Sequence, residues 1–221
     1  MNLGLLTTSY RRQLLDKDLT ETTDGLVGLV LDLGGEKERR GSFKIPQSDQ
    51  LQWLCVNIDD LTLPEIVAKV EHVPLQSACA DVVVCTEVLE HVLEPSLVIY
   101  ESSRLLHSGG LFLISMPFIY HVHADPYDYQ RYTASKLTTL LIQAGFGDIE
   151  IKAQGFYFTV LADMLRDGLN QLRHRAVRWP LALVVLPFMR LMIYFDAQIW
   201  VKSSARLSSY TTGYFVKAVK L

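Results

Sequence analysis

Residues 120–133, with the sequence YHVHADPYDYQRYT, form the densest group of polar and aromatic side chains in the chain. His123 can accept a proton near neutral pH, where an imidazole changes its charge. Arg131 can hold a phosphate or a carboxylate of a ligand through its planar guanidinium. A structural interpretation is also open, in which Asp128 pairs with Arg131 and Thr133 caps the following helix.

The same stretch could instead hold a metal ion. His121, His123 and Asp125 are all residue types that bind metals. They come from one short loop, however, and the sequence suggests no fourth ligand. We therefore predict that the chain has no metal site.

Polar residues also follow several apolar runs that are expected to be buried strands. The runs cover residues 26–34, 52–59, 80–88 and 111–118. Their ends read Asp32-Leu33-Gly34-Gly35, Asp59-Asp60, Thr86-Glu87 and Pro117-Phe118. Four polar ends in one sheet indicate a ligand site, although any single acid there could be only a turn residue.

Helical patterns alternate with these strands. We predict helices over 9–20, with Ser9 as N-cap, over 94–110, ending at Ser108-Gly109-Gly110, and over 133–146, ending at Gly145. The segments 148–154 and 213–221 alternate like strands. Strands that alternate with helices predict an α/β doubly wound, mostly parallel sheet, which binds ligands beyond the carboxyl ends of its strands.

The amino-acid composition excludes some kinds of protein and partner. The chain has 221 residues, of which 49% are hydrophobic, and a net charge of -3 without a basic stripe, so we expect no nucleic-acid partner. Its three cysteines, Cys55, Cys79 and Cys85, have no CxxC spacing, which favours free thiols in a reducing compartment. The N-terminus lacks a signal-peptide pattern, so we expect a cytoplasmic protein. The oligomeric state stays open.

Six stretches together resemble the class I S-adenosylmethionine-dependent methyltransferases, in the broad group called type 11. They are VLDLGG, VNIDD, ADVVVCTEVLEHV, RLLHSGGLFLISMPF, HADPYDYQRYT and LLIQAGF, in the order that the family has them. The chain is most similar to the bacterial members that accompany polysaccharide and lipid-glycan synthesis genes. The resemblance runs from about Leu26 to Gly155 and returns at the last strand. It implies a seven-stranded sheet with an antiparallel last strand.

The resemblance also implies roles for matching residues. Asp32, Gly34 and Gly35 would form the loop under the methionine part of S-adenosylmethionine, and Asp59 would hold the ribose hydroxyls. Thr86 and Glu87 would lie between the cofactor and the acceptor. Glu90 and His91 match the LEH signature, although His91 could equally be a buried residue bonded to a backbone carbonyl. On the acceptor side, the family pattern implies catalytic or binding roles for His123, Asp128 and Arg131.

Two residues depart from the family pattern. The family's loop reads Asp-x-Gly-x-Gly, and its second glycine is Glu36 here, where a side chain could crowd the cofactor or repel its carboxylate. Relatives commonly have an Asp at the position of Lys69, to receive the adenine amino group, and Glu71 could take its place. Both departures allow a catalytically degenerate protein that acts as a binding module.

The segment 156–209 resembles the family poorly and is expected to be a helical, apolar insertion within a single domain that covers residues 1–221. Residues 179–200 are strongly apolar, but Pro187, Arg190 and Asp196 argue against a membrane span. One interpretation is a cap that walls the acceptor pocket. The other is peripheral contact with a membrane, with His174, Arg175 and Arg178 toward the lipid headgroups.

The sequence therefore predicts an S-adenosylmethionine-dependent methyltransferase that acts on oxygen or nitrogen of a small-molecule, glycan or lipid-linked acceptor. The alternative is the degenerate binding module. A nicotinamide-dependent oxidoreductase ranks last, since residues 34–39 read Gly-Gly-Glu-Lys-Glu-Arg and not Gly-x-Gly-x-x-Gly.

Overall fold

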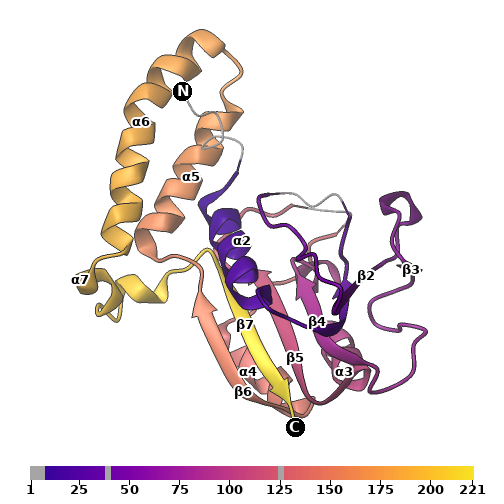
Figure 1. Ribbon diagram of the computed structural model, residues 1–221. Coiled ribbons are helices and arrows are strands. Elements are labelled where there is room, and N and C mark those ends of the chain that lie inside the picture. Colours follow the sequence, from indigo (N-terminus) through magenta and orange to yellow (C-terminus); the bar gives the residue numbers. More distant parts are fainter. Residues whose placement is uncertain (1–7, 38–40, 124–126) are drawn as a thin grey trace.

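A seven-stranded sheet forms the centre of the computed structural model, which describes residues 8–37, 41–123 and 127–221 (Figure 1). The strands lie in the order β3-β2-β1-β4-β5-β7-β6. Strands β1 to β5 pair in parallel, whereas β7 is antiparallel to both of its neighbours. The predicted α/β fold with an antiparallel last strand is confirmed. The strands are β1 (Gly28–Leu33), β2 (Leu51–Asn57), β3 (Ile66–Val67), β4 (Ala80–Thr86), β5 (Leu106–Pro117), β6 (Phe146–Ala153) and β7 (Gly213–Lys220).

The start of β5 differs from the prediction. The helix expected over 94–110 ends at Leu105, and β5 begins at the next residue. Between the pairs Ala80–Leu106 and Val82–Leu111 the register of β4 and β5 shifts, so that residues 107–110 bulge out of the ladder. A Cβ on Gly110 would lie 2.9 Å from the carbonyl oxygen of His107. The glycine pair therefore serves this bulge and not the end of a helix.

Helices cover both faces of the sheet. On one face, α3 (Pro95–Leu105) and α4 (Ala134–Gln143) bury Ile99, Leu105 and Leu141 against strand residues such as Leu31 and Ile114. On the other face, α2 (Tyr10–Thr23) packs Leu15 and Leu19 on Val30, Val84 and Leu113.

Both predicted helix starts are confirmed by their caps. The Ser9 hydroxyl accepts a hydrogen bond from the Arg12 amide at 3.1 Å, and the Thr133 hydroxyl accepts one from the Lys136 amide at 3.3 Å. The described residues between β1 and β2, 34–37 and 41–50, contain no helix. The face that a helix between β1 and β2 would cover is covered instead by α2, which precedes β1 in the chain.

A helical hairpin stands apart from the sheet. Helices α5 (Tyr157–Gln171) and α6 (Arg175–Asp196) pack along each other and extend away from the strands, and α7 (Ile199–Lys202) follows (Figure 1). Their own buried cluster includes Ala162, Leu169, Met189 and Met192, and the first residue of α2, Tyr10, joins it. Among the described residues, only α6 is long and apolar enough to cross a bilayer by length and composition, with a mean hydropathy of 1.6 and 22% of that window buried.

Candidate active site

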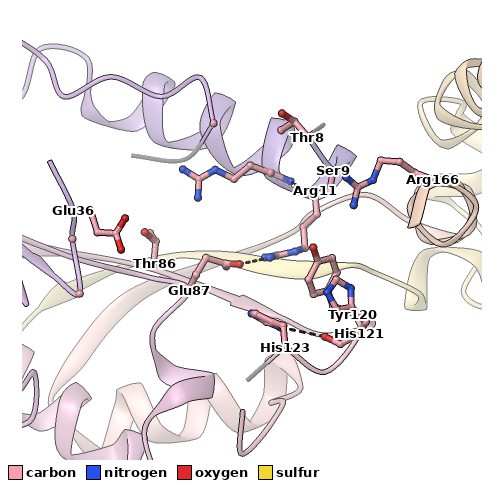
Figure 2. Close-up of a pocket in the computed structure, with 14 residues that line it drawn as sticks. Thr8, Ser9, Arg11, Glu36, Thr86, Glu87, Tyr120, His121, His123 and Arg166 are labelled. Carbon is pink, nitrogen blue, oxygen red and sulfur yellow. Dashed lines mark hydrogen bonds and ion pairs between the residues drawn. The ribbon is translucent and has the colours of Figure 1, made fainter. Parts of the chain in front are cut away.

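A cavity of about 500 Å³ opens at the carboxyl ends of β1 and β4 (Figure 2). Its wall comes from the loops after these two strands, the start of α2, the loop after β5, and α5. The lining residues are Thr8, Ser9, Arg11, Arg12, Gly34, Gly35, Glu36, Gly41, Thr86, Glu87, Tyr120, His121, His123 and Arg166. The crevice lies where a doubly wound sheet binds its ligands.

Four of the predicted cofactor residues line this cavity, namely Gly34, Gly35, Thr86 and Glu87. Gly34 has a positive φ of 74°, and a Cβ there would lie 2.4 Å from Val88. A Cβ on Gly35 would lie 2.4 Å from the carboxyl carbon of Asp32. Only glycine fits at either position, so the backbone itself faces the cavity.

The other three predicted cofactor residues do not line the cavity. Asp32 lies buried beneath Gly35 and accepts a hydrogen bond from the Trp53 indole at 3.0 Å. Asp59 is exposed, and its carboxylate accepts a hydrogen bond from the Leu61 amide at 2.9 Å. Glu71 is half-buried in the turn that follows β3. Asp32 thus supports the loop from below, while Asp59 and Glu71 remain predictions as ligands.

Asn57 is a residue that the sequence analysis missed. It is the last residue of β2, and its side-chain amide donates to the Gly35 carbonyl at 3.2 Å. The Gly34 amide donates to the carbonyl of Val56 at 2.7 Å, which holds this strand end against the glycine loop. The signal in the sequence was a polar residue inside an apolar run that was expected to continue to Asp59.

Arg11 and Glu87 form a buried ion pair across the cavity (Figure 2). The Glu87 carboxylate also accepts a hydrogen bond from the Ser115 hydroxyl at 2.6 Å. Burial acts to raise the pKa of Glu87, but the Arg11 guanidinium outweighs it and holds that pKa below its usual value. Glu87 is therefore ionised at neutral pH.

Glu90, one turn further along the chain, is fully buried in the short helical turn Leu89–His91. Burial raises the pKa of its carboxyl to about 8, and the neighbouring Glu87 carboxylate adds to the shift. Neither carboxylate oxygen of Glu90 has a hydrogen-bond partner among the described residues.

The loop that carries His123 is docked onto this turn. The Tyr129 amide donates to the Glu90 carbonyl at 2.8 Å, and the His91 Nδ1 lies 2.5 Å from the Tyr127 carbonyl oxygen. His91 thus makes the backbone contact that its structural interpretation predicted. Asp125, which the sequence analysis weighed as a metal ligand, lies outside the described residues.

Asp128 and Arg131 pair with each other through two contacts and do not line the cavity. This contact holds the pKa of Asp128 well below its usual range. The Asp128 carboxylate also accepts a hydrogen bond from the His123 amide at 3.0 Å. The pair therefore fixes the loop, and only His123 of the three predicted catalytic residues lines the cavity.

His123 is neutral at neutral pH in this setting. Burial lowers the pKa of its imidazole, and the nearby His91 adds to the shift. The ring stands edge-on to Tyr120, at 5.5 Å between centroids. Tyr120 also lies under the Arg11 guanidinium, at 4.6 Å, so the loop and α2 meet at the cavity.

Comparisons with known proteins agree with this geometry. A methyltransferase domain model matches residues 42–114, from the loop before β2 into β5. A probable S-adenosylmethionine-dependent methyltransferase of Mycobacterium tuberculosis is 34% identical over 88 residues, which cover 37% of this chain and 32% of the relative. Another such protein from Mycolicibacterium smegmatis is 34% identical over 97 residues, covering 41% of this chain and 37% of the relative.

Solved structures match nearly the whole fold. A SAM-dependent methyltransferase from Archaeoglobus fulgidus superimposes with a TM-score of 0.56 at 16% identity, over 95% of this chain and 94% of the other. Phosphoethanolamine N-methyltransferase 2 of Haemonchus contortus, solved with S-adenosyl-L-methionine, has a TM-score of 0.56 at 14% identity, over 93% and 52%. Residues 42–114 thus match a methyltransferase domain, and the whole chain shares the fold of these methyltransferases.

The sequence matches lie in the middle of the chain. The matched segments span about a third of the length of the curated relatives, 32% and 37%. The family model begins after the glycine loop, at residue 42, and ends before the hairpin. Arg11 and Arg166, which line the cavity from α2 and α5, lie outside the matched domain, and no motif in the sequence marked them.

Proposed function

We propose that this protein is an S-adenosylmethionine-dependent methyltransferase that acts on oxygen or nitrogen of a small-molecule, glycan or lipid-linked acceptor. One observation carries the proposal: a cavity at the carboxyl ends of β1 and β4 that exposes the backbone of Gly34 and Gly35 beside Thr86 and Glu87. The relatives named as S-adenosylmethionine-dependent methyltransferases support it.

The residues around the cavity fit this cofactor. A Cβ at Gly34 would clash with Val88 and one at Gly35 with Asp32, so both positions require glycine and present bare backbone to a ligand. Asp59 and Asn57 at the end of β2 would bind the ribose hydroxyls, and Glu71 would receive the adenine amino group. When bound, the cofactor supplies a methyl group on a sulfonium, and transfer leaves the bonding electron pair on sulfur.

The acceptor would lie against the wall made by Tyr120, His121, His123 and Arg166. These residues bind and orient it so that the accepting atom faces the methyl group in line. The neutral imidazole of His123 can take the proton that the acceptor loses. Arg166 is paired with Asp167 at 2.5 Å, and Arg131 with Asp128, so neither cation is freely available to an anionic acceptor.

The degenerate binding module keeps one observation in its favour. Glu36 replaces the family's second glycine and lines the cavity beside the predicted cofactor loop (Figure 2). Its carboxylate would face the carboxylate of the cofactor. Cofactor binding separates the two functions.

We expect calorimetric titration to show micromolar binding of S-adenosylmethionine and of S-adenosylhomocysteine. The variant Asp59→Ala should weaken this binding roughly 10- to 100-fold, because a charge-assisted hydrogen bond contributes about 1.5–3 kcal/mol. Asp60→Ala is the matched control, since Asp60 is the next residue and is also exposed.

Other results of the titration decide between the alternatives. If Asn57→Ala weakens binding and Asp59→Ala does not, the strand end at Asn57 holds the ribose and the prediction for Asp59 is wrong. No binding of either ligand by a folded protein would refute the transferase. In that case Glu36→Gly should be titrated, because restored binding would identify Glu36 as the cause.

We further propose that the protein is cytoplasmic and contacts a membrane surface through residues 179–200. One face of α6 exposes apolar side chains at helical spacing, namely Val177, Leu181, Val184, Phe188, Leu191 and Tyr194, which are 42–71% exposed. The exposed charged residues of α6 are Arg175 and Arg190, and both are positive. An exposed apolar face on a helix whose exposed charges are basic suits anionic lipid headgroups.

Liposome flotation tests this contact. We expect the protein to float with vesicles that contain phosphatidylglycerol and to stay behind when Phe188→Glu and Leu191→Glu are combined, since each buried charge opposes insertion. Leu61→Glu is the control, because Leu61 is 84% exposed on a turn far from α6 in the chain. No flotation, together with a stable dimer that the same double variant disrupts, would show that a second copy covers this face instead.

A further inference from the structure

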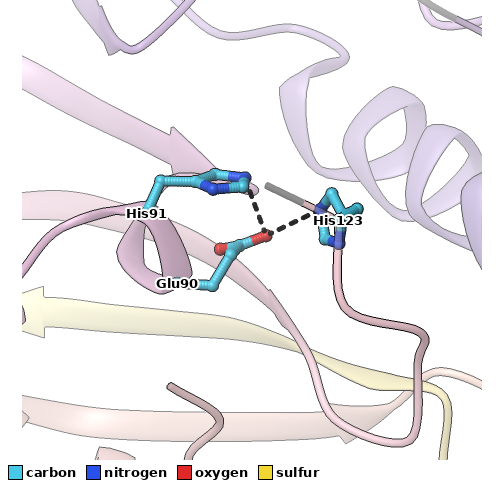
Figure 3. Close-up of side chains that lie close together, drawn as sticks. All are labelled: Glu90, His91 and His123. Carbon is cyan, nitrogen blue, oxygen red and sulfur yellow. Dashed lines mark ion pairs between the residues drawn. The ribbon is translucent and has the colours of Figure 1, made fainter. Parts of the chain in front are cut away.

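Three side chains from two separate segments converge beside the cavity, namely Glu90, His91 and His123 (Figure 3). The Glu90 Oε1 lies 3.8 Å from the His91 Nε2 and 4.0 Å from the His123 Nε2. All three potential ligand atoms lie within 4.8 Å of one another. The two imidazoles thus point the same ring nitrogen at one carboxylate oxygen.

The carboxylate of Glu90 is a buried group without a partner. Its side chain is 0% exposed, and neither oxygen accepts a hydrogen bond among the described residues. A buried polar group that lacks partners is destabilising, and a bound cation would remove this cost. The charges that face it are already balanced, because Arg11 pairs with Glu87 and Arg131 pairs with Asp128. Glu90 is therefore the uncompensated acid of this cluster.

The histidines are oriented as metal ligands are. The His91 Nδ1 lies 2.5 Å from the Tyr127 carbonyl oxygen, and the His123 Nδ1 lies 3.2 Å from the His121 carbonyl oxygen. A backbone carbonyl can only accept, so each Nδ1 carries the proton and donates it. Each Nε2 then keeps its lone pair, which faces Glu90. Hydrogen bonds of this kind fix the tautomer of histidines that bind metals.

We propose that Glu90, His91 and His123 bind a divalent transition-metal cation. Two imidazole nitrogens and one carboxylate oxygen suit zinc, manganese or iron(II) better than magnesium. Two atoms bonded to a tetrahedral cation at about 2.1 Å lie roughly 3.4 Å apart, so the observed separations need only a small closure. Three protein ligands leave coordination positions open.

The metal has a defined role if the proposed transferase function holds, and this second step rests on that function. His123 lines the cavity, so an oxygen of the acceptor can reach the open positions. Coordination would lower the pKa of a bound hydroxyl, so that it releases its proton to water, and the resulting oxygen would attack the methyl group while the bonding pair stays on the sulfur of the cofactor. His123 is then a ligand and not the base, because one Nε2 lone pair cannot serve both roles. The acceptor class is a compound with a metal-binding hydroxyl group.

Equilibrium dialysis of the chelator-stripped protein against Zn²⁺, Mn²⁺ and Mg²⁺ tests the site. We expect about one Zn²⁺ or Mn²⁺ per chain and little Mg²⁺, measured by elemental analysis. His91→Ala, His123→Ala and Glu90→Gln should each weaken binding by at least roughly 100-fold, since even supporting residues of metal sites contribute 10- to 100-fold. The metal should also raise the Tm of the wild type and not that of the three variants.

His121→Ala is the matched control. His121 lies on the same loop and lines the same cavity, but its Nδ1 faces Asp167 at 3.4 Å. We expect this variant to keep the metal. Equal binding in all four variants, or no stoichiometric binding by folded wild type, would overturn the site. Titration of the same preparations with S-adenosylmethionine tests the transferase function separately. Failure of the metal site would therefore not be mistaken for failure of cofactor binding, or the reverse.

Discussion

Replacement of Arg11 by methionine is expected to lower the free energy of unfolding by about 3 kcal/mol. The Arg11 side chain is 6% exposed and pairs with Glu87, which is 18% exposed and reaches the cavity. Removal of one partner of a buried ion pair leaves an uncompensated charge, which typically costs about 3–5 kcal/mol. We take the lower end, because the cavity lets water reach Glu87.

Thermal unfolding measures this effect. For a domain of this size, about 3 kcal/mol corresponds to a fall in Tm of roughly 6–12 °C. Lys17→Met on the same helix is the control, because Lys17 is 66% exposed and lies 3.7 Å from its partner Glu21. A change of less than about 0.5 kcal/mol is expected there.

The double variant Arg11→Met with Glu87→Gln distinguishes charge from packing. If the unpaired carboxylate causes the loss, the neutral glutamine should restore at least half of the stability that Arg11→Met removes. If the double variant is no more stable than Arg11→Met alone, the loss comes from the contacts of the Arg11 side chain, such as its stacking on Tyr120.

Strand-end residues could be placed from the sequence because the topology of a parallel sheet brings them together. Gly34 and Gly35 follow β1, and Thr86 and Glu87 lie at the end of β4 and just after it. These two strands are hydrogen-bonded neighbours in the sheet. Short apolar runs with polar ends are enough to predict this edge. Of the strands in the described residues, only β3 was not predicted, because its two residues are too few to show a periodic pattern.

Local patterns could not decide how a strand ends or how a glycine is used. The apolar run of β2 continues to Asp59, but pairing with β1 ends at Val56 and the strand itself ends at Asn57. Asp59 turns to cap the next short helix. Gly109 and Gly110 look like a helix stop, but they serve a bulge between β4 and β5. In each case hydrogen bonds to another strand override the local preference.

Contacts between residues that are distant in the sequence could not be predicted. Arg11 and Glu87 are 76 positions apart, and α2 reads as an ordinary polar helix. Glu90 and His123 meet only because the loop after β5 docks onto the turn after β4. A single sequence carries no record of such contacts, so both appear only in the three-dimensional structure.

Replacement of Asp196 by alanine is expected to destabilise the helical hairpin by about 3 kcal/mol. Asp196, 6% exposed at the end of α6, accepts hydrogen bonds from the amides of Phe156, Phe158 and Thr159 at 2.8, 3.0 and 2.8 Å. These amides belong to the start of α5, whose N-cap Phe156 has no capping side chain. The carboxylate thus supplies the missing cap from the other helix, where its charge also suits the helix dipole.

Loss of this carboxylate leaves buried amide groups without partners, which accounts for the expected magnitude. Asp196→Asn keeps one acceptor oxygen and should fall between wild type and alanine, whereas the exposed Asp49→Ala should change stability by less than about 0.5 kcal/mol.

Global unfolding and cleavage within residues 157–202 should be followed together by circular dichroism and limited proteolysis. The hairpin has its own buried cluster, so we expect cleavage in Asp196→Ala to begin at temperatures where the sheet is still folded. Simultaneous loss of both signals would show that the hairpin and the sheet unfold as one unit. Unchanged stability of both would mean that water replaces the carboxylate at the start of α5, and that the hairpin is held by its apolar contacts alone.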